Sequence, residues 1–104
     1  MNPQERFVRA VELHQAGQID QAEVIYQKIL QHEPAHHAAL NLLGLIDCQK
    51  GRMDSAVRHL RMAAGVASGV AKYHYDLAVA LHTAGQLPGA IEAYFKALEC
   101  DPGY

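Results

Sequence analysis

A nine-residue phrase returns three times along this chain at a fixed interval of 34 residues. The copies read HQAGQIDQA at 14–22, CQKGRMDSA at 48–56 and HTAGQLPGA at 82–90. A fixed period of roughly 20 to 50 residues is typical of proteins in which one small structural unit is stacked on the next. The 104 residues have room for three such units, and we expect them to form a single domain.

Each unit is predicted to contain two helices separated by the glycine of the phrase. Apolar residues recur at spacings of three and four on both sides of Gly17, Gly51 and Gly85, and no alternating strand pattern is found. A glycine suits the left-handed residue that ends a helix, and the Asp20 that follows Gly17 suits the first turn of the next helix. The predicted helices span 3–16, 19–32, 36–50, 53–67, 70–84 and 87–100.

Composition excludes several classes of function. The net charge of −2 and the pI near 6.4 do not provide the basic face of a nucleic-acid-binding protein. The sequence contains no apolar run of about 20 residues that would cross a membrane, and its first residues lack the apolar core of a signal peptide. Cys48 and Cys100 follow no metal-binding or disulfide spacing. These features predict a soluble, cytoplasmic protein with two free thiols.

The unit resembles the tetratricopeptide repeat, a 34-residue pair of helices. The resemblance covers nearly the whole chain, with repeats at 3–36, 37–70 and 71–104. The residues that carry it are Ala10, Gly17, Ala22, Tyr26, Ile29 and Pro34, then Leu43, Gly44, Gly51, Ala56, Leu60 and Ala63, then Leu77, Ala78, Gly85, Ala90, Tyr94, Ala97 and Pro102. The resemblance implies an all-α, right-handed α-solenoid of six helices. In such a solenoid, small residues let helices approach closely and larger ones fill the space between units.

The same resemblance implies a binding site. In this family, ligands lie in a concave groove that is lined by the first helix of each pair. The corresponding positions are Phe7, Val11, His14 and Gln15 in the first unit, Asn41, Leu45, Cys48 and Gln49 in the second, and Lys72, Tyr75, Val79 and His82 in the third. Lys72 is the only ionic member of this set. A nearly neutral groove suits an extended, partly apolar peptide or a neighbouring domain of the same protein.

Two ligand-binding clusters of the family are missing from these positions. Members that hold a peptide's terminal carboxylate share lysine, arginine and asparagine residues in the groove, and this chain lacks that cluster. Members of the O-GlcNAc transferase type carry a ladder of asparagines, but Val8, Leu42 and Asp76 stand at its positions here. We therefore predict a protein–protein interaction module. The alternatives are a substrate-presenting appendage of a larger, glycosyltransferase-like enzyme, an end-to-end oligomerising scaffold, and a groove too short to bind a peptide alone.

No catalytic, cofactor or metal site is predicted. His14, Cys48 and His82 are metal-ligand types at the same position of successive units. Equivalent points on stacked units should be about 10 Å apart, whereas zinc needs ligands at roughly 2.0–2.3 Å. No catalytic triad, carboxylate pair or phosphate-binding loop is recognised. We therefore expect these three side chains to line the groove and the protein not to be an enzyme.

Asp47 replaces an apolar residue, because Leu13 and Leu81 stand at the same position in the other two units. A buried carboxylate requires a partner. Lys50 lies about one turn later on the same helix, so we expect a partly exposed ion pair between Asp47 and Lys50.

The two ends of the chain differ. Asn2, Pro3 and Glu5 form a typical helix start, whereas no polar capping helix follows the third unit. We expect the apolar face of the last helix to be partly uncovered; its residues are Ile91, Tyr94, Phe95 and Leu98. Two hypotheses follow: the chain is the N-terminal part of a longer protein, or it self-associates through this face.

Overall fold

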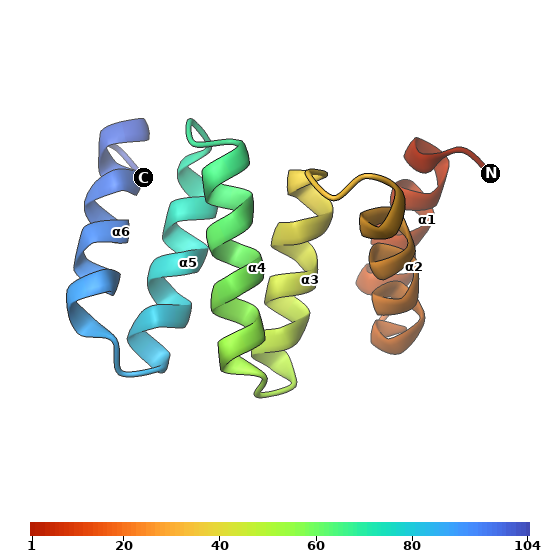
Figure 1. Cartoon of the computed structure of the whole chain (residues 1–104), viewed down its shortest axis with the longest axis horizontal. Coiled ribbons are helices and arrows are strands. Elements are labelled where there is room, and N and C mark those ends of the chain that lie inside the picture. Colours follow the sequence, from red (N-terminus) through yellow and green to blue (C-terminus); the bar gives the residue numbers. More distant parts are fainter.

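The structure is a computed structural model that describes all 104 residues, and it contains six α-helices and no strand. The helices are α1 (Pro3–Gln15), α2 (Ile19–His32), α3 (His37–Gln49), α4 (Met53–Val66), α5 (Ala71–Thr83) and α6 (Leu87–Cys100). Their ends lie within one residue of the predicted ones, so the all-α prediction is confirmed. The helices stand side by side in chain order as an elongated array of 40 × 26 × 23 Å (Figure 1). None of them is long and apolar enough to cross a membrane.

The helix ends follow from local chemistry. Gly17, Gly51 and Gly85 have φ angles of 81°, 75° and 79°, the left-handed region that favours glycine, and each one ends the first helix of its pair. At the start of α1, the side-chain oxygen of Asn2 accepts a hydrogen bond from the Glu5 backbone N–H at 2.8 Å. The Asn2 side-chain amide donates to the Glu5 carboxylate, also at 2.8 Å. The predicted cap is therefore present.

The core is built from small residues opposite large ones. The largest side chains with almost no exposure include Tyr26, Ile29 and Leu60. At Gly44 the approach between α3 and α4 is so close that a Cβ atom would lie 2.6 Å from Cγ of Leu60. The packing of small against large residues that the sequence predicts is therefore realised at this pair.

The expected pairing of Asp47 with Lys50 is wrong. Asp47 is only 3% exposed and points toward α4, where Arg52 Nε, Ser55 Oγ and His59 Nδ1 lie 3.1, 2.9 and 2.7 Å from its carboxylate oxygens. Lys50 caps the end of α3 and instead reaches across to α2. Because the two side chains leave α3 in different directions, they belong to different interactions.

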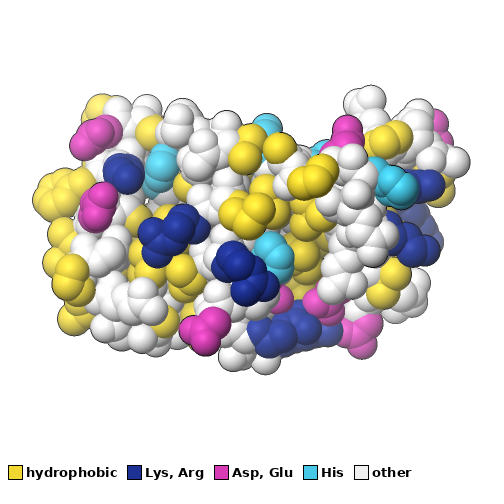
Figure 2. All heavy atoms as spheres, viewed as in Figure 1, with side chains coloured by type: hydrophobic (Ala, Val, Ile, Leu, Met, Phe, Trp, Pro, Cys, Tyr) yellow, Lys and Arg dark blue, Asp and Glu magenta, His cyan; other side chains and the backbone are white.

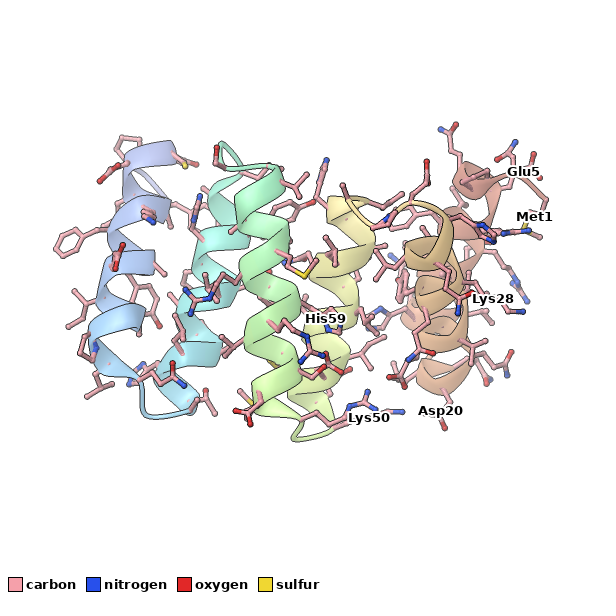
Figure 3. The ribbon with its side chains drawn as sticks, in the orientation of Figure 1. Met1, Glu5, Asp20, Lys28, Lys50 and His59 are labelled. Carbon is pink, nitrogen blue, oxygen red and sulfur yellow. The ribbon has the colours of Figure 1, made fainter.

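Lys50 and Arg52 join the first unit to the second. Lys50 forms ion pairs with Asp20 and with Glu23, the latter at 2.9 Å, and Arg52 also pairs with Glu23. Figure 3 shows Asp20 at the start of α2 beside Lys50, and His59 on α4. We call Asp20, Glu23, Asp47, Lys50, Arg52 and His59 the charged junction. It connects two units that the sequence pattern treats as independent copies.

Candidate peptide-binding surface

The twelve predicted groove residues lie on the first helix of each pair: α1, α3 and α5. In α1, Phe7, Val11 and His14 are half-buried and Gln15 is exposed. The Phe7 ring lies 5.0 Å from the ring of His36 and 6.1 Å from that of Tyr26. His14 Nδ1 lies 3.3 Å from the Tyr26 hydroxyl oxygen. The first unit therefore presents side chains that are already packed against their own unit.

The second unit has few exposed polar side chains among its predicted groove residues. Asn41 is only 2% exposed, and its side-chain amide donates to Asp76 Oδ2 on α5 at 3.1 Å. Leu45 and Cys48 are half-buried, and Gln49 is exposed. Asn41 therefore connects α3 to α5, and Gln49 is the exposed polar side chain of this unit's predicted set.

The third unit is the most open part of the predicted surface. Lys72, Tyr75, Val79 and His82 are all exposed, with Tyr75 at 42%. Tyr75 lies between two other tyrosines: its ring is 5.8 Å from that of Tyr94 and 5.5 Å from that of Tyr104. An exposed ring held by neighbouring rings offers apolar area at a small cost in side-chain entropy.

The single cation of the surface is neutralised by a residue outside the predicted set. Lys72 Nζ lies 2.5 Å from Asp76 Oδ2, one helical turn away, and the same oxygen accepts from Asn41. The spacing of four residues between Lys72 and Asp76 is the sequence signal from which Asp76 could have been added to the predicted groove residues. With Lys72 engaged, the surface has no free cation for a carboxylate.

Cys48 is a poor nucleophile in this position. Burial raises the pKa of its thiol above 9.0, and the nearby carboxylates of Asp47 and Asp76 raise the pKa further. The thiol therefore stays protonated near neutral pH. No three His, Cys, Asp or Glu side chains lie close enough together to hold a metal ion.

Three rings recur in the first and third units. Phe7, Tyr26 and His36 lie 68 residues before Tyr75, Tyr94 and Tyr104, and both sets are in ring contact. In the second unit, these positions hold Asn41, Leu60 and Val70. Sequence reasoning missed the role of His36 and Tyr104, which the interval of 34 residues could have revealed. The surface thus has aromatic clusters at both ends and a polar middle.

Two surface cavities are present, and among the predicted residues Phe7 alone lines one of them. The cavity that Phe7 lines has a volume of about 380 Å³ and lies where α1 begins, beside Glu33 and His36. The other, of about 440 Å³, is lined by residues of α4, α5 and α6. Neither of these two cavities is formed by the predicted residues as a set, which is compatible with contact of those residues to an extended chain.

Comparison with known proteins agrees with this architecture. A family model described as tetratricopeptide repeat matches residues 13–75, and a second with the same description matches 49–104. No curated protein sequence matches the chain. A mutant O-GlcNAc transferase from Thermobaculum terrenum has a TM-score of 0.91 and 32% identity, over 98% of this chain and 20% of that one. MamA from Desulfovibrio magneticus RS-1 has a TM-score of 0.88 and 25% identity, over 99% of this chain and 58% of that one. The chain thus spans about a fifth of the length of the O-GlcNAc transferase and somewhat over half of the length of MamA.

Proposed function

Because this chain belongs to the tetratricopeptide repeat family, we propose that it is a protein-interaction module whose surface on α1, α3 and α5 binds an extended, partly apolar peptide or a neighbouring domain. The observation that carries the proposal is the exposed aromatic and aliphatic pair of Tyr75 and Val79 beside a lysine already neutralised by Asp76. Such a surface favours apolar contact and offers no site for a charged terminus.

Recognition would combine apolar contacts with hydrogen bonds from side-chain amides. Tyr75, Val79 and Leu45 supply the apolar area, and Gln15 and Gln49 supply exposed amides. An extended chain advances about 3.3 Å per residue. With equivalent points on neighbouring units about 10 Å apart, each unit would contact about three residues of the peptide. No bond is made or broken in this function.

The proposal is tested with peptides selected from a displayed random library. We expect Tyr75→Ala with Val79→Ala to weaken binding of the selected peptides by about tenfold or more, because both side chains are exposed and contribute contact area. The matched control is Val24→Ala with Val66→Ala, which alters exposed valines of α2 and α4 outside the surface. Bound peptide should also slow alkylation of Cys48. Unchanged affinity of the double variant together with unprotected Cys48 would overturn the proposal.

A second candidate function is a substrate-presenting part of a larger enzyme. It is supported by the similarity of 98% of this chain to one fifth of an O-GlcNAc transferase. Under this candidate, the peptide bound on α1, α3 and α5 is the substrate of a catalytic domain encoded beyond Tyr104. A coding sequence with no such domain after Tyr104 would exclude it.

We also propose that α6 mediates self-association. Ile91, Phe95 and Leu98 are 56%, 61% and 43% exposed, and Tyr94 beside them is half-buried. The positions of Ile91 and Leu98 in the earlier units are covered: Glu23 and Leu30 in α2 and Val57 and Ala64 in α4 are buried or half-buried. Molar mass measured against protein concentration tests this proposal, and a mass that stays monomeric contradicts it.

A further inference from the structure

The cavity of about 440 Å³ lies between α4 and α6, and α5 supplies its third wall. We call it the α4–α6 cavity. None of the twelve predicted groove residues lines it. Its volume is within the range of about 300–1,000 Å³ that is usual for small-molecule sites. The α4–α6 cavity is therefore a candidate ligand site separate from the proposed peptide-binding surface.

Small side chains keep the α4–α6 cavity open. The same positions one unit earlier, at the junction of α2 and α4, carry larger side chains: Leu30 for Ala64, Ser55 for Gly89 and His59 for Ala93. Even at Gly89, an added Cβ atom would meet only the side chain of Leu81, at 3.5 Å, which is ordinary contact. The chain thus contains two versions of one junction, and the second version replaces large side chains with small ones.

The α4–α6 cavity is polar at one end and apolar at the other. At the end near the connection from α4 to α5, His74 Nε2 donates to the Ser68 carbonyl oxygen at 2.8 Å, and Cys100 Sγ donates to the same oxygen at 3.3 Å. His74 is only 7% exposed, and its Nδ1 forms no hydrogen bond within the chain. At the other end, Leu81 lies against Gly89. A ligand with one polar and one apolar end matches this arrangement.

Two cations line the α4–α6 cavity from opposite sides, Arg61 on α4 and Lys96 on α6. The two helices run in the same direction and begin and end at equivalent residues (Figure 1). Lys96 follows the equivalent of Arg61 by one residue, so the two differ in height by about 1.5 Å along the helices. In Figure 2, Lys or Arg side chains lie over the region between α4 and α6, beside hydrophobic ones. An anion at this height would meet both cations.

Both cations are available to a ligand. Arg61 forms no ion pair. Lys96 pairs only with Glu92 on the same helix, at 3.4 Å, and both of these side chains are more than half exposed, so the pair is weak. An anion between Arg61 and Lys96 therefore displaces no strong interaction.

The charges at the α4–α6 cavity favour a ligand with a single negative charge. Glu92 and Glu99 also line it, about one helical turn to either side of Lys96. These carboxylates balance the two cations, so a dianion would be repelled more than a monoanion. The guanidinium of Arg61 matches the planar geometry of a carboxylate. The suitable head group is therefore a carboxylate.

We propose that the α4–α6 cavity binds a monocarboxylate with an unbranched apolar chain. The chain lies along Leu77 and Leu81, and the carboxylate lies between Arg61 and Lys96. The lining residues of α6 run from Gly89 to Cys100, about 16 Å along the helix, which provides room for a chain of medium length. This site is independent of peptide binding on α1, α3 and α5 and of self-association through α6.

Isothermal titration calorimetry with decanoate tests the site. We expect saturable binding of one decanoate per chain and at least tenfold weaker binding of decyltrimethylammonium, which has the same chain and the opposite charge. Arg61→Gln should weaken decanoate binding by about fivefold or more, because it removes a charge-assisted hydrogen bond. Arg58→Gln is the matched control, since Arg58 is an exposed arginine of α4 that forms no ion pair and does not line the cavity.

A filled cavity gives a second test. Ala64→Leu with Gly89→Ser installs the residues of the preceding junction and should weaken decanoate binding by about tenfold or more, with helicity checked by circular dichroism. Two-dimensional NMR of the original protein locates the ligand. Decanoate should shift amide signals of 61–68 and 89–100 and leave those of 3–15 unchanged.

Each outcome supports or overturns the site without bearing on peptide binding. Absence of saturable decanoate binding overturns it. Equal losses with Arg58→Gln and Arg61→Gln would show attraction to the general charge of α4 and overturn the assigned head-group position. Undiminished binding by the folded, filled variant overturns the cavity as the location. Binding of an acidic, apolar peptide at 61–68 and 89–100 by a protein that does not bind decanoate would assign the cavity to a protein partner instead.

Discussion

At the scale of single residues, Asp47 is a buried carboxylate with three side-chain partners. These partners come from the start of α4: Arg52, Ser55 and His59. Because His59 Nδ1 faces a carboxylate oxygen, this nitrogen carries the proton. The third unit holds Leu81 and Ala93 in place of Asp47 and His59. The same pair of helix positions is therefore filled by apolar side chains elsewhere in this chain.

We expect Asp47→Asn to lower the free energy of unfolding by about 1–3 kcal/mol, because the amide removes the buried anion that faces His59 and Arg52 Nε, while Arg52 keeps only its pair with Glu23. Asp47→Leu with His59→Ala copies the third unit and should leave the free energy within about 1 kcal/mol of the original, since a buried ion pair is often replaceable by apolar groups. Urea denaturation followed by circular dichroism measures both. An Asp47→Asn protein as stable as the original would contradict this account.

Glu23 makes stability depend on pH. Burial raises the pKa of its carboxyl group, but the hydrogen bonds and charges of Lys50 and Arg52 lower it more, so the folded value is below the ordinary 4.5. A depressed folded pKa contributes stability above the unfolded value, and this contribution is lost as the pH falls through the folded one. Glu23→Gln should therefore be less stable at neutral pH and lose less stability on acidification. Glu12→Gln, on exposed α1 surface, is the control. Parallel pH profiles for Glu23→Gln and the original protein would refute the assignment.

At the scale of helices, two glycines have opposite roles. Gly44 lets α3 approach Leu60 of α4, and a methyl group there would overlap the leucine side chain. Gly65 lies in α4 with open space around its Cα. We expect Gly44→Ala to destabilise by about 1–2 kcal/mol, because overpacking exceeds the gain in helix propensity. Gly65→Ala should stabilise by about 0.5–1 kcal/mol. Thermal unfolding of the two variants distinguishes them, and shifts of the same sign would contradict the packing argument.

The ends of α1, α3 and α5 and the start of α1 were predictable to within one residue because they depend on local chemistry, namely the positive φ of Gly17, Gly51 and Gly85 and the Asn2 cap. The period also identified which residues occupy equivalent positions. It did not identify the partners of Asp47, the contact of Asn41 with Asp76 or the cavity of about 440 Å³ lined by residues of α4, α5 and α6. Those features depend on which side chains touch one another. A repeat pattern shows which positions of the units are equivalent, but it does not show which residues are in contact.

At the scale of the whole molecule, the two junctions between units are held by different forces. The first is the charged junction, in which Lys50 and Arg52 bind acidic residues of α2. At the second junction, the positions of Glu23, Lys50 and Arg52 are occupied by Val57, Ala84 and Gln86. Leu60, Leu77 and Leu81 belong to one apolar cluster there. The first unit is therefore attached to the second in part by ion pairs, whereas the third unit is attached by apolar contact and by neutral or amide hydrogen bonds such as that of Asn41 with Asp76.

This difference predicts where local unfolding begins. Arg52→Gln introduces the residue found at positions 18 and 86 and removes the Arg52 contacts with Glu23 and Asp47. Since Arg52 is partly exposed, we expect a loss of about 1 kcal/mol at the first junction, and thus about fivefold faster amide exchange in α1 and α2 with α5 and α6 unchanged. Hydrogen exchange with mass spectrometry of the peptides measures this. Lys96→Gln, which removes an exposed pair within α6, should leave α1 and α2 unaffected. Equal acceleration in all six helices by Arg52→Gln would show that the array unfolds as one unit and that the charged junction is not a separate weak point.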